Sequence, residues 1–480
     1  MGLTSGIAAA LRGKSRSCAG GGHTGGPATG GGRTVDHGTT GGHGTTVGHG
    51  TTGGHGTTGG RRSIPLVLSL ALVLSIVAAA CGSDTPTTVP DGSSTPIATG
   101  GSTSDGRSTP PASPVPVPKH EVYGFVPYWE MDDGIAAHVR DVDLSTLALF
   151  SVTHKRSGDL ATNQNGYKRI VGPIGRRLIR DAHARKRRVE LVYTSFGTDK
   201  NRRFFGDQAA QERWIGQLVD LADELGVDGI NVDVEQLPVE LIPAYGSFVG
   251  RLRAALLERL PDAGLSAATG ANERGAAMAA AAADAGADRI FLMGYDYHWA
   301  GSDPGASAPL DRYDGEVKDL VWSLDTYAAL GVPVERTLLG LPLYGMTWPV
   351  VGPGVGSPAT GRGDHWVPRK NLRVFQDPSF APLYEPIESV EFYSVPAAGP
   401  APSGGLVPGG SADAEADRGW YAVYYDSPRS LTPKLALADD RGLAGVGFWA
   451  IGYERGLPGY GELIATFHAG KLDGSSSSTP

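Results

Sequence analysis

Eight short apolar runs alternate with helical patterns between Glu121 and about residue 470, and this alternation constrains the fold more than any other feature of the chain. The runs are rich in β-branched, aromatic and leucine residues, and they lie at 122–129, 147–152, 189–195, 228–235, 265–269, 290–297, 338–344 and 445–450. Strands that alternate with helices predict βαβ units and a parallel sheet. Eight such units predict an α/β fold of the (β/α)8 TIM-barrel type, whose functional residues gather at the carboxyl ends of the strands.

Helical patterns fill most of the gaps between these runs. The helix expected before the fourth run ends at Gly226, and its apolar residues recur at intervals of four, three and four: Trp214, Leu218, Leu221 and Leu225. Pro238 is expected to open the following helix, because proline is tolerated in a first turn. The alanine-rich stretch 276–285 predicts another helix, since alanine is the best helix former.

The connection between the seventh and eighth runs, 345–444, is much longer than the others. It contains strand-like pieces at 389–394 and 420–426 and a Gly/Pro-rich loop at 399–410. A structureless loop of this length inside a compact domain is implausible. We therefore expect a small α+β insertion, at about 346–426, on the rim formed by the carboxyl ends of the strands.

The fourth run, which reads DGINVDVE, alternates polar and apolar residues. Strand side chains point alternately to opposite faces, so Asn231, Asp233 and Glu235 share one face. A half-buried surface strand also alternates in this way, but a parallel strand between two long helices is normally buried on both faces. Two acids and an amide that face inward are costly unless they are paired or used. The row therefore predicts a functional site at the end of this strand.

The fourth run resembles the Asp-x-x-Asp-x-Asp-x-Glu signature of glycoside hydrolase family 18, the chitinase family, and in particular its bacterial spore-germination and cortex-lytic glucosaminidase branch. The resemblance covers nearly all of 121–470 and implies a catalytic domain at 120–472. It implies that Glu235 is the general acid/base, that Asp233 holds the acetamido group of the substrate, and that Asp228 is an outer acid. The sequence departs from the common pattern at Asn231, where most chitinases have a third inner Asp. An amide can hydrogen-bond Asp233 but cannot share its proton.

Two further motifs are similar to that family. The segment Met293-x-Tyr295-Asp296 is similar to its Met-x-Tyr-Asp motif, which implies that Tyr295 and Asp296 contact the N-acetyl group and that Met293 faces inward. Trp449 is similar to the tryptophan under the sugar at the scissile bond, since an apolar ring face suits a pyranose. An ordinary buried aromatic strand and a core tryptophan are the alternatives. Other aromatic residues near strand ends are candidates for substrate binding or for core packing: Tyr123, Tyr128, Trp129, Trp299, Tyr344 and Trp348.

The resemblance implies a retaining glycosidase that cleaves β-1,4 bonds next to N-acetylglucosamine by substrate-assisted catalysis. Such an enzyme needs no metal or cofactor, and its Glu235 has to be protonated at rest, so burial or nearby negative charge should raise the pKa of that carboxyl. Chitin fragments, peptidoglycan strands and N-glycan cores all remain open as substrates, although Asn231 and the lipoprotein-like signal favour cell-wall glycan or N-acetylglucosamine oligomers. The alternatives are a non-catalytic carbohydrate-binding protein and a peptidoglycan-remodelling or germination factor. The net charge of −8 argues against nucleic acid as a partner, and we expect a monomer.

The first sixty residues are a low-complexity Gly/His/Thr-rich segment with almost nothing apolar to bury. A six-residue unit that begins at His37 recurs from His43, His49 and His55. A His-rich tract can bind metal, but we expect a disordered tail or a start codon assigned too far upstream.

Residues 61–81 resemble a bacterial lipoprotein signal. Two arginines precede an apolar run, 64–80, which is short for a membrane span, and small residues then lead to Cys81. We expect lipidation of Cys81 and a membrane-anchored lipoprotein on the cell surface, with an ordinary secretory signal and a secreted protein as the alternative. Residues 82–119 form a Ser/Thr/Pro-rich linker, and 473–480 a disordered tail. The only cysteines are Cys18 and Cys81, so the exported domain contains no disulfide.

Overall fold

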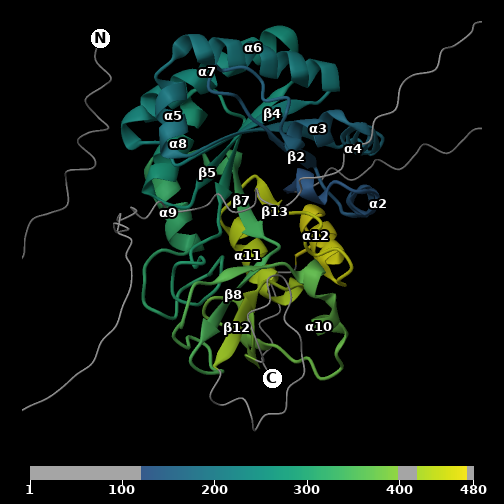
Figure 1. Ribbon diagram of the computed structural model, residues 1–480, viewed down its shortest axis with the longest axis vertical. Helices are drawn as coiled ribbons and strands as arrows, with labels where there is room; N and C mark the ends of the chain where they lie inside the picture. The colour runs from purple at the N-terminus through teal and green to yellow at the C-terminus, as the bar shows by residue number, and fades with distance from the viewer. Residues whose placement is uncertain (1–119, 398–418, 473–480) are drawn as a thin grey trace, which may run out of the picture. The chain divides into compact units, whose positions relative to one another are not determined.

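The computed structural model describes residues 120–397 and 419–472, which form a barrel with a smaller sheet inserted before its last strand (Figure 1). Within these two ranges no helix is long and apolar enough to cross a bilayer. Several predicted segments lie outside the described residues: the tail 1–60, the signal segment 61–81 with Cys81, the linker 82–119, the Gly/Pro-rich loop 399–410 and the tail 473–480.

Eight parallel strands close into a barrel in the order β1-β13-β7-β6-β5-β4-β3-β2, which confirms the predicted fold class. The strands are β1 (Glu121–Pro127), β2 (Thr146–Val152), β3 (Arg188–Phe196), β4 (Gly229–Glu235), β5 (Gly264–Gly270), β6 (Arg289–Met293), β7 (Thr337–Pro342) and β13 (Gly445–Trp449). Seven of the eight predicted runs end within two residues of the observed strands. The prediction for the sixth was wrong at its end, because β6 stops at Met293 and the next residues form a loop.

Helices cover the outside of the barrel, and α6 and α7 lie side by side over β4 (Figure 1). They are α2 (Asp133–Asp141), α3 (Asn165–Val171), α4 (Pro173–His183), α5 (Thr198–Phe205), α6 (Gln208–Leu225), α7 (Ile242–Arg259), α8 (Glu273–Asp284), α9 (Leu320–Ala329), α11 (Pro428–Asp440) and α12 (Tyr460–His468). The predicted end of α6 is confirmed, since Gly226 follows it with a left-handed φ of 65°. The prediction for Pro238 was wrong in detail: Pro238 precedes a 3-10 turn (Val239–Leu241), and α7 begins at Ile242 with Pro243 in its first turn.

The barrel interior is filled by side chains in layers, as is usual for this fold. An aromatic layer near its middle centres on Phe291, whose ring lies 4.9 Å from that of Phe125. Gly340 and Gly447 make room for this ring, because a Cβ at either position would come within 2.4 Å of it. The middle of the barrel is therefore closed, and any ligand site has to lie at one of its ends.

The predicted insertion is confirmed as a five-stranded antiparallel sheet in the order β10-β11-β12-β8-β9. Its elements are β8 (Gly345–Val350), β9 (Asp364–Trp366), α10 (Leu372–Gln376), β10 (Leu383–Glu385), β11 (Val390–Pro396) and β12 (Trp420–Tyr425). The sheet has a small aromatic core of its own around Trp366, Tyr393 and Tyr425. Because β8 follows the end of β7 after two residues, the insertion stands at the carboxyl-end rim of the barrel.

Candidate active site

The end of β4 carries two carboxylates into the mouth of the barrel. In the sheet register Asp233 lies opposite Thr194 of β3 and Ala268 of β5, and Glu235 lies opposite Phe196. Asp233 is 4% exposed and Glu235 is half-buried. The alternate residues belong to the core that the strands share with the helices: Ile230, Val232 and Val234. The predicted alternation of the two faces is therefore confirmed.

Below these acids, four buried side chains form a connected group that we call the interior network: Tyr123, Glu190, Asn231 and Ser266. Glu190 Oε2 accepts hydrogen bonds from Tyr123 Oη at 2.7 Å and from Ser266 Oγ at 2.5 Å. Asn231 Nδ2 in turn donates to Ser266 Oγ at 2.7 Å. Burial raises the pKa of the Glu190 carboxyl, and its two hydroxyl donors oppose that rise. Glu190 and Ser266 were not predicted as site residues, because each lies in a run whose pattern indicates only a buried strand.

Tyr123 does not fit its predicted role in substrate binding. Its side chain is 2% exposed and points into the barrel, where its hydroxyl is bonded to Glu190. In β1 it lies opposite Thr146 and Gly447, well before the carboxyl end of the strand. We therefore assign Tyr123 to the interior network. Trp348 is likewise fully buried, against Tyr424 of the inserted sheet, and does not reach a surface.

Two buried acceptors at the top of this network have no hydrogen-bond partner among the described residues: Asn231 Oδ1 and Asp233 Oδ1. The Asn231 amide, which is able to hydrogen-bond Asp233, donates to Ser266 instead. Burial, and then the charge of Glu235, raise the pKa of Asp233 well above its ordinary value. Tyr245 of α7 also has a buried hydroxyl without a partner in the described chain, and its pKa is raised first by burial and then by the charge of Asp233. A buried polar atom without a partner calls for an explanation, and at the mouth of the barrel a bound ligand or a held proton would satisfy these atoms.

Glu235 lies where burial and charge act together. Burial raises the pKa of its carboxyl to about 7, and the negative charge of Asp296 adds to the rise, which confirms the predicted direction. The backbone of Glu235 is fixed from α5, because Asn201 Nδ2 donates to its carbonyl oxygen at 2.5 Å. Asn201 Oδ1 accepts in turn from Ser195 Oγ at 2.7 Å. A carboxyl with this pKa can both give and take a proton near neutral pH.

Tyr295 and Asp296 lie in the loop that follows β6. Met293 ends the strand and faces the interior aromatic cluster, as predicted. Asp296 is exposed and has a left-handed φ of 63°, and Tyr344 donates a hydrogen bond to its Oδ1. The pKa of Tyr295 is raised well above its ordinary value by burial, then by the charges of Asp233, Asp296 and Glu235. The structure thus brings the predicted residues of β4 and β6 into one electrostatic cluster.

The inserted sheet holds this loop in place. Glu388, which is fully buried, accepts a hydrogen bond from the backbone N–H of Ala306 at 2.7 Å and lies 3.2 Å from Nε2 of His298. Ser307 Oγ accepts a hydrogen bond from the backbone N–H of Asp296 at 3.1 Å and donates one to Tyr344 Oη at 3.1 Å. None of these contacts could be read from the sequence, because Glu388 lies 90 residues beyond His298.

Aromatic side chains line one side of the mouth. Trp449 is half-buried, and its ring lies 4.7 Å from Phe150 and 6.2 Å from Trp129. Trp129 is 38% exposed and donates from Nε1 to Tyr453 Oη at 3.0 Å, and Phe196 is 39% exposed. This row offers apolar ring faces next to Glu235, which suits the apolar face of a sugar ring.

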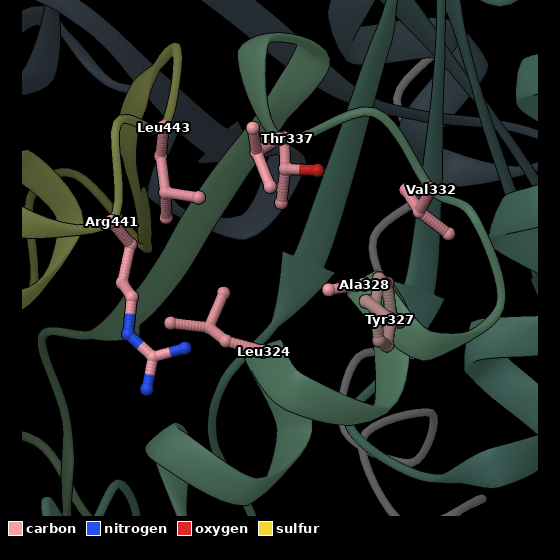
Figure 2. Close-up of a pocket in the computed structure, with 8 residues that line it drawn as sticks. Leu324, Tyr327, Ala328, Val332, Thr337, Arg441 and Leu443 are labelled. Atoms are coloured by element: carbon pink, nitrogen blue, oxygen red, sulfur yellow. The ribbon is translucent and has the colours of Figure 1, made fainter.

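A small pocket elsewhere in the domain does not belong to this site. It lies between α9 and the amino-terminal ends of β7 and β13, and Figure 2 shows Leu324, Tyr327, Thr337, Arg441 and Leu443 around it. The side chains that line this pocket are mostly aliphatic, and no carboxyl group is among them. The candidate site is therefore the carboxyl-end cluster, by which we mean Asp233, Glu235, Tyr295 and Asp296.

Comparison with known proteins agrees with this geometry. The chain is 23% identical over 269 residues to the cortical fragment-lytic enzyme of Bacillus subtilis (strain 168), covering 55% of this chain and 56% of that protein. It is 30% identical over 186 residues to Chitinase 63 of Streptomyces plicatus, covering 37% of this chain and 26% of that one. The chain thus spans about half or less of these relatives' length.

Solved structures show the same fold. The Group IV chitinase of Ostrinia furnacalis, in complex with allosamidin, aligns with a TM-score of 0.60 at 18% identity, covering 75% of this chain and all of that one. The family profile described as glycosyl hydrolases family 18 matches residues 121–454. That match spans the barrel, the inserted sheet and every residue of the carboxyl-end cluster. The chain belongs to family 18 of the glycosyl hydrolases.

Proposed function

We propose that the protein is a retaining glycosidase that cleaves β-1,4 bonds next to N-acetylglucosamine by substrate-assisted catalysis. The observation that carries this proposal is the Glu235 carboxyl, half-buried at the barrel mouth, with a pKa raised to about 7 beside Asp233 and Asp296. Family membership and relatives named as a cortical fragment-lytic enzyme and a chitinase support the same class of substrate.

In the first step, Glu235 donates its proton to the glycosidic oxygen as the bond to the leaving sugar breaks. A pKa near 7 keeps a large part of the carboxyl protonated at neutral pH. The bond that forms is from the carbonyl oxygen of the substrate's own N-acetyl group to the anomeric carbon, giving an oxazolinium ion. Most retaining glycosidases use a second protein carboxylate as the nucleophile, and family 18 is an exception because the substrate's N-acetyl group takes that role.

Asp233 would orient the acetamide and stabilise its developing positive charge. Its Oδ1 is buried and has no partner in the described chain, so it is available to accept from the acetamide N–H. Tyr295, whose charge environment includes both Asp233 and Glu235, would hold the same group from the other side. Glu235, now ionised, then takes a proton from the water that opens the oxazolinium ion, and retention of configuration follows from two inversions.

The place of the protein in the cell is a separate part of the proposal. We propose that Cys81 carries a lipid anchor, that the domain acts outside the membrane on a GlcNAc-containing polysaccharide, and that it works as a monomer. The signal-like segment 61–81 and the Ser/Thr/Pro-rich linker 82–119 support an exported domain. Metabolic labelling with a fatty acid, in cells that express the chain or its Cys81→Ser variant, tests the anchor, and a label that persists in the variant would contradict it.

The catalytic proposal is tested with the purified full chain, chitotetraose and N-acetylated peptidoglycan strands, with products identified by mass spectrometry. We expect new reducing ends from at least one glycan, the β-anomer first, and their loss in Glu235→Gln. Binding of the glycans without cleavage by either protein would instead identify a carbohydrate-binding protein on the same barrel.

A further inference from the structure

A second hollow lies on the carboxyl-end side of the barrel, between the loop after β2 and helix α5. It is an open pocket of about 660 Å³, a size within the usual range for ligand sites. Four of its lining residues are cationic: Lys155, Arg156, Lys200 and Arg203. No carboxylate lines it. In a chain of net charge −8, this is a local concentration of positive charge.

Lys200 is the most informative of these cations. Its side chain is half-buried, and Nζ donates to the hydroxyl of Thr153 at 2.6 Å. Burial lowers the pKa of Lys200 to about 8, so it is still mostly charged at neutral pH. Within the described ranges it makes no ion pair. A partly buried ammonium group without a carboxylate is costly, unless a ligand supplies the negative charge.

The cations at the rim have ordinary explanations of their own. Arg203 lies in the last turn of α5, where positive charge is favoured by the helix dipole. Hydrogen bonds from Ser157 and Gln217 lower the pKa of the Asp159 carboxyl, and the charge of nearby Lys155 adds to this effect. The contrast that matters is with Arg202, the neighbour on α5, which faces away from the pocket and pairs with Glu240 at 2.9 Å. Lys200, at the base of the pocket, has no such partner in the described chain.

The pocket is connected to the carboxyl-end cluster. Thr153 Oγ1 donates to the backbone oxygen of Thr194 at 2.6 Å, and Thr194 lies opposite Asp233 in the sheet. Neighbouring strands are about 5 Å apart, so the pocket begins roughly 10 Å from β4. Lys200 also precedes Asn201, whose side chain holds the backbone of Glu235. A polymer held at Glu235 would therefore have to extend only about 10 Å for one of its groups to reach Lys200.

We propose that this pocket binds a carboxylate carried by the glycan, next to the N-acetylglucosamine that is cleaved. This inference rests on the proposed glycosidase function and narrows its substrate class. Chitin and the N-glycan core are neutral, whereas a peptidoglycan strand carries a lactyl group on alternate sugars, whose carboxylate is either free or joined to a stem peptide that bears carboxylates of its own. Lysine and arginine together suit such a group, since guanidinium and ammonium donors form charge-assisted hydrogen bonds with it.

The test compares three versions of one defined peptidoglycan strand, in which N-acetylglucosamine alternates with the amino sugar that carries the lactyl group. The first version has no peptides and keeps its lactyl carboxylates, and the second has those carboxylates amidated. The third carries stem peptides on some lactyl groups and has the remaining lactyl carboxylates amidated. The full chain is assayed for kcat/KM on each, and the Glu235→Gln protein for Kd. We expect the carboxylated strand to be preferred over the amidated one by about tenfold, as for one charge-assisted hydrogen bond. A preference restored by the peptide-bearing strand would identify the peptide as the source of the carboxylate.

The preference is then followed through matched variants. In Lys200→Met the ratio of kcat/KM between carboxylated and amidated strands should fall close to one. In Arg202→Gln, on the same helix but outside the pocket, it should stay at the wild-type value. Raising the salt concentration from 0.05 to 0.5 M should also reduce the ratio, because the rim of the pocket is open to solvent. If Lys200→Met does not fold, Arg156→Gln, an exposed position, gives the same comparison with a smaller expected drop.

The two proposals fail in different ways. Cleavage of all three strands with equal kcat/KM by the wild type, or a ratio unchanged in Lys200→Met, overturns the carboxylate site and leaves the glycosidase intact. A tighter Kd for the carboxylated strand in Glu235→Gln, with no cleavage of any strand by the wild type, keeps the carboxylate site and overturns the glycosidase.

Discussion

The interior network and the carboxyl-end cluster hold buried carboxyl groups on neighbouring strands, and they differ in how those groups are satisfied. Glu190 of β3 accepts two hydrogen bonds from hydroxyl groups, whereas Asp233 of β4 leaves Oδ1 without a partner among the described residues. Burial raises the pKa of both. Hydrogen bonds offset part of the cost of burying an acid, and an acceptor left without a partner adds to that cost. The difference separates a carboxyl group that the surrounding hydroxyl groups satisfy from one that keeps an open acceptor at the barrel mouth.

Asn231 lies at the boundary between the two regions. Its amide nitrogen is bonded into the interior network through Ser266, while its Oδ1 faces the other way and has no partner in the described chain. One side chain therefore couples a closed hydrogen-bond system to an open one. Substitutions in the carboxyl-end cluster should therefore act mainly on activity, and substitutions in the interior network mainly on stability. The expected effects range from loss of catalysis to a shift of a pH profile.

The largest effect is expected for Glu235→Gln. The amide cannot donate a catalytic proton, and loss of general acid/base catalysis typically costs a factor of about 10² to 10⁴ in rate. Initial rates on the preferred glycan measure it, with Glu258→Gln, an exposed glutamate on α7, as the matched control. A Glu235→Gln protein that kept more than a tenth of the wild-type rate would place the acid elsewhere.

Asp233→Asn should lower activity and raise stability together. The activity loss should be about a hundredfold or more, as for removal of one group that stabilises a charged intermediate. The new amide nitrogen could donate to Asn231 Oδ1, and satisfying a buried acceptor is worth about 1 kcal/mol or more of unfolding free energy. Denaturant unfolding at pH 5 and pH 8 measures the change in unfolding free energy.

The sign of the pH dependence follows from the raised pKa of Asp233. An acid whose pKa is higher in the folded state binds more protons when folded, so the wild type loses stability as the pH rises from the unfolded value near 4 toward the folded value. The Asp233→Asn variant lacks this loss, and its advantage should grow between pH 5 and pH 8. A variant less stable than wild type at both values would show that the Asp233 carboxyl is satisfied after all.

Glu190→Gln should have the opposite effect on stability. It leaves the carboxyl-end cluster in place, so activity should fall less than tenfold, but it disturbs two good hydrogen bonds and should cost about 1 to 3 kcal/mol of unfolding free energy. Because the pKa of Glu190 is also raised, the wild type loses stability with rising pH, and the deficit of the variant should shrink from pH 5 to pH 8. Tyr123→Phe removes one donor without changing a charge and is the control: it should cost about 1 kcal/mol at pH 5 and more at pH 8, because the lost hydroxyl group lowers the pKa of Glu190. A Glu190→Gln protein as stable as the wild type would remove the distinction between the two regions.

The sequence was sufficient for one of these regions and not for the other. The alternation in β4, together with the family signature, located Asp233 and Glu235, and the strand pattern gave the barrel and its insertion. Glu190 and Ser266 escaped, because each is one polar residue in an apolar run, and only the register of three strands brings them to Asn231. Contacts between residues 35 and 76 apart depend on the closed barrel rather than on any local pattern.

The loop after β6 was out of reach for a different reason. Its residues 294–297 continue an apolar strand pattern, yet the chain leaves the sheet at Gly294, and Asp296 adopts a left-handed backbone conformation. Tyr344, which lies between β7 and β8, and Glu388, which lies between β10 and β11, hold the loop in this position. Tertiary contacts here override a local strand preference.

The smallest effect, and the most specific to this chain, is expected for Asn231→Asp. A third carboxyl beside Asp233 and Glu235 makes ionisation of the group harder, and like charges in one site raise the pKa of at least one member. Since the Glu235 carboxyl has to be protonated to act, the alkaline limb of the kcat/KM profile, expected near pH 7 in the wild type, should move upward by about one unit. The new carboxyl also faces Ser266, which already donates to Glu190, so a modest loss of stability should accompany the shift. Superimposable pH profiles for the two proteins would mean that Asn231 acts only through the interior network and that the carboxyl-end cluster titrates without it.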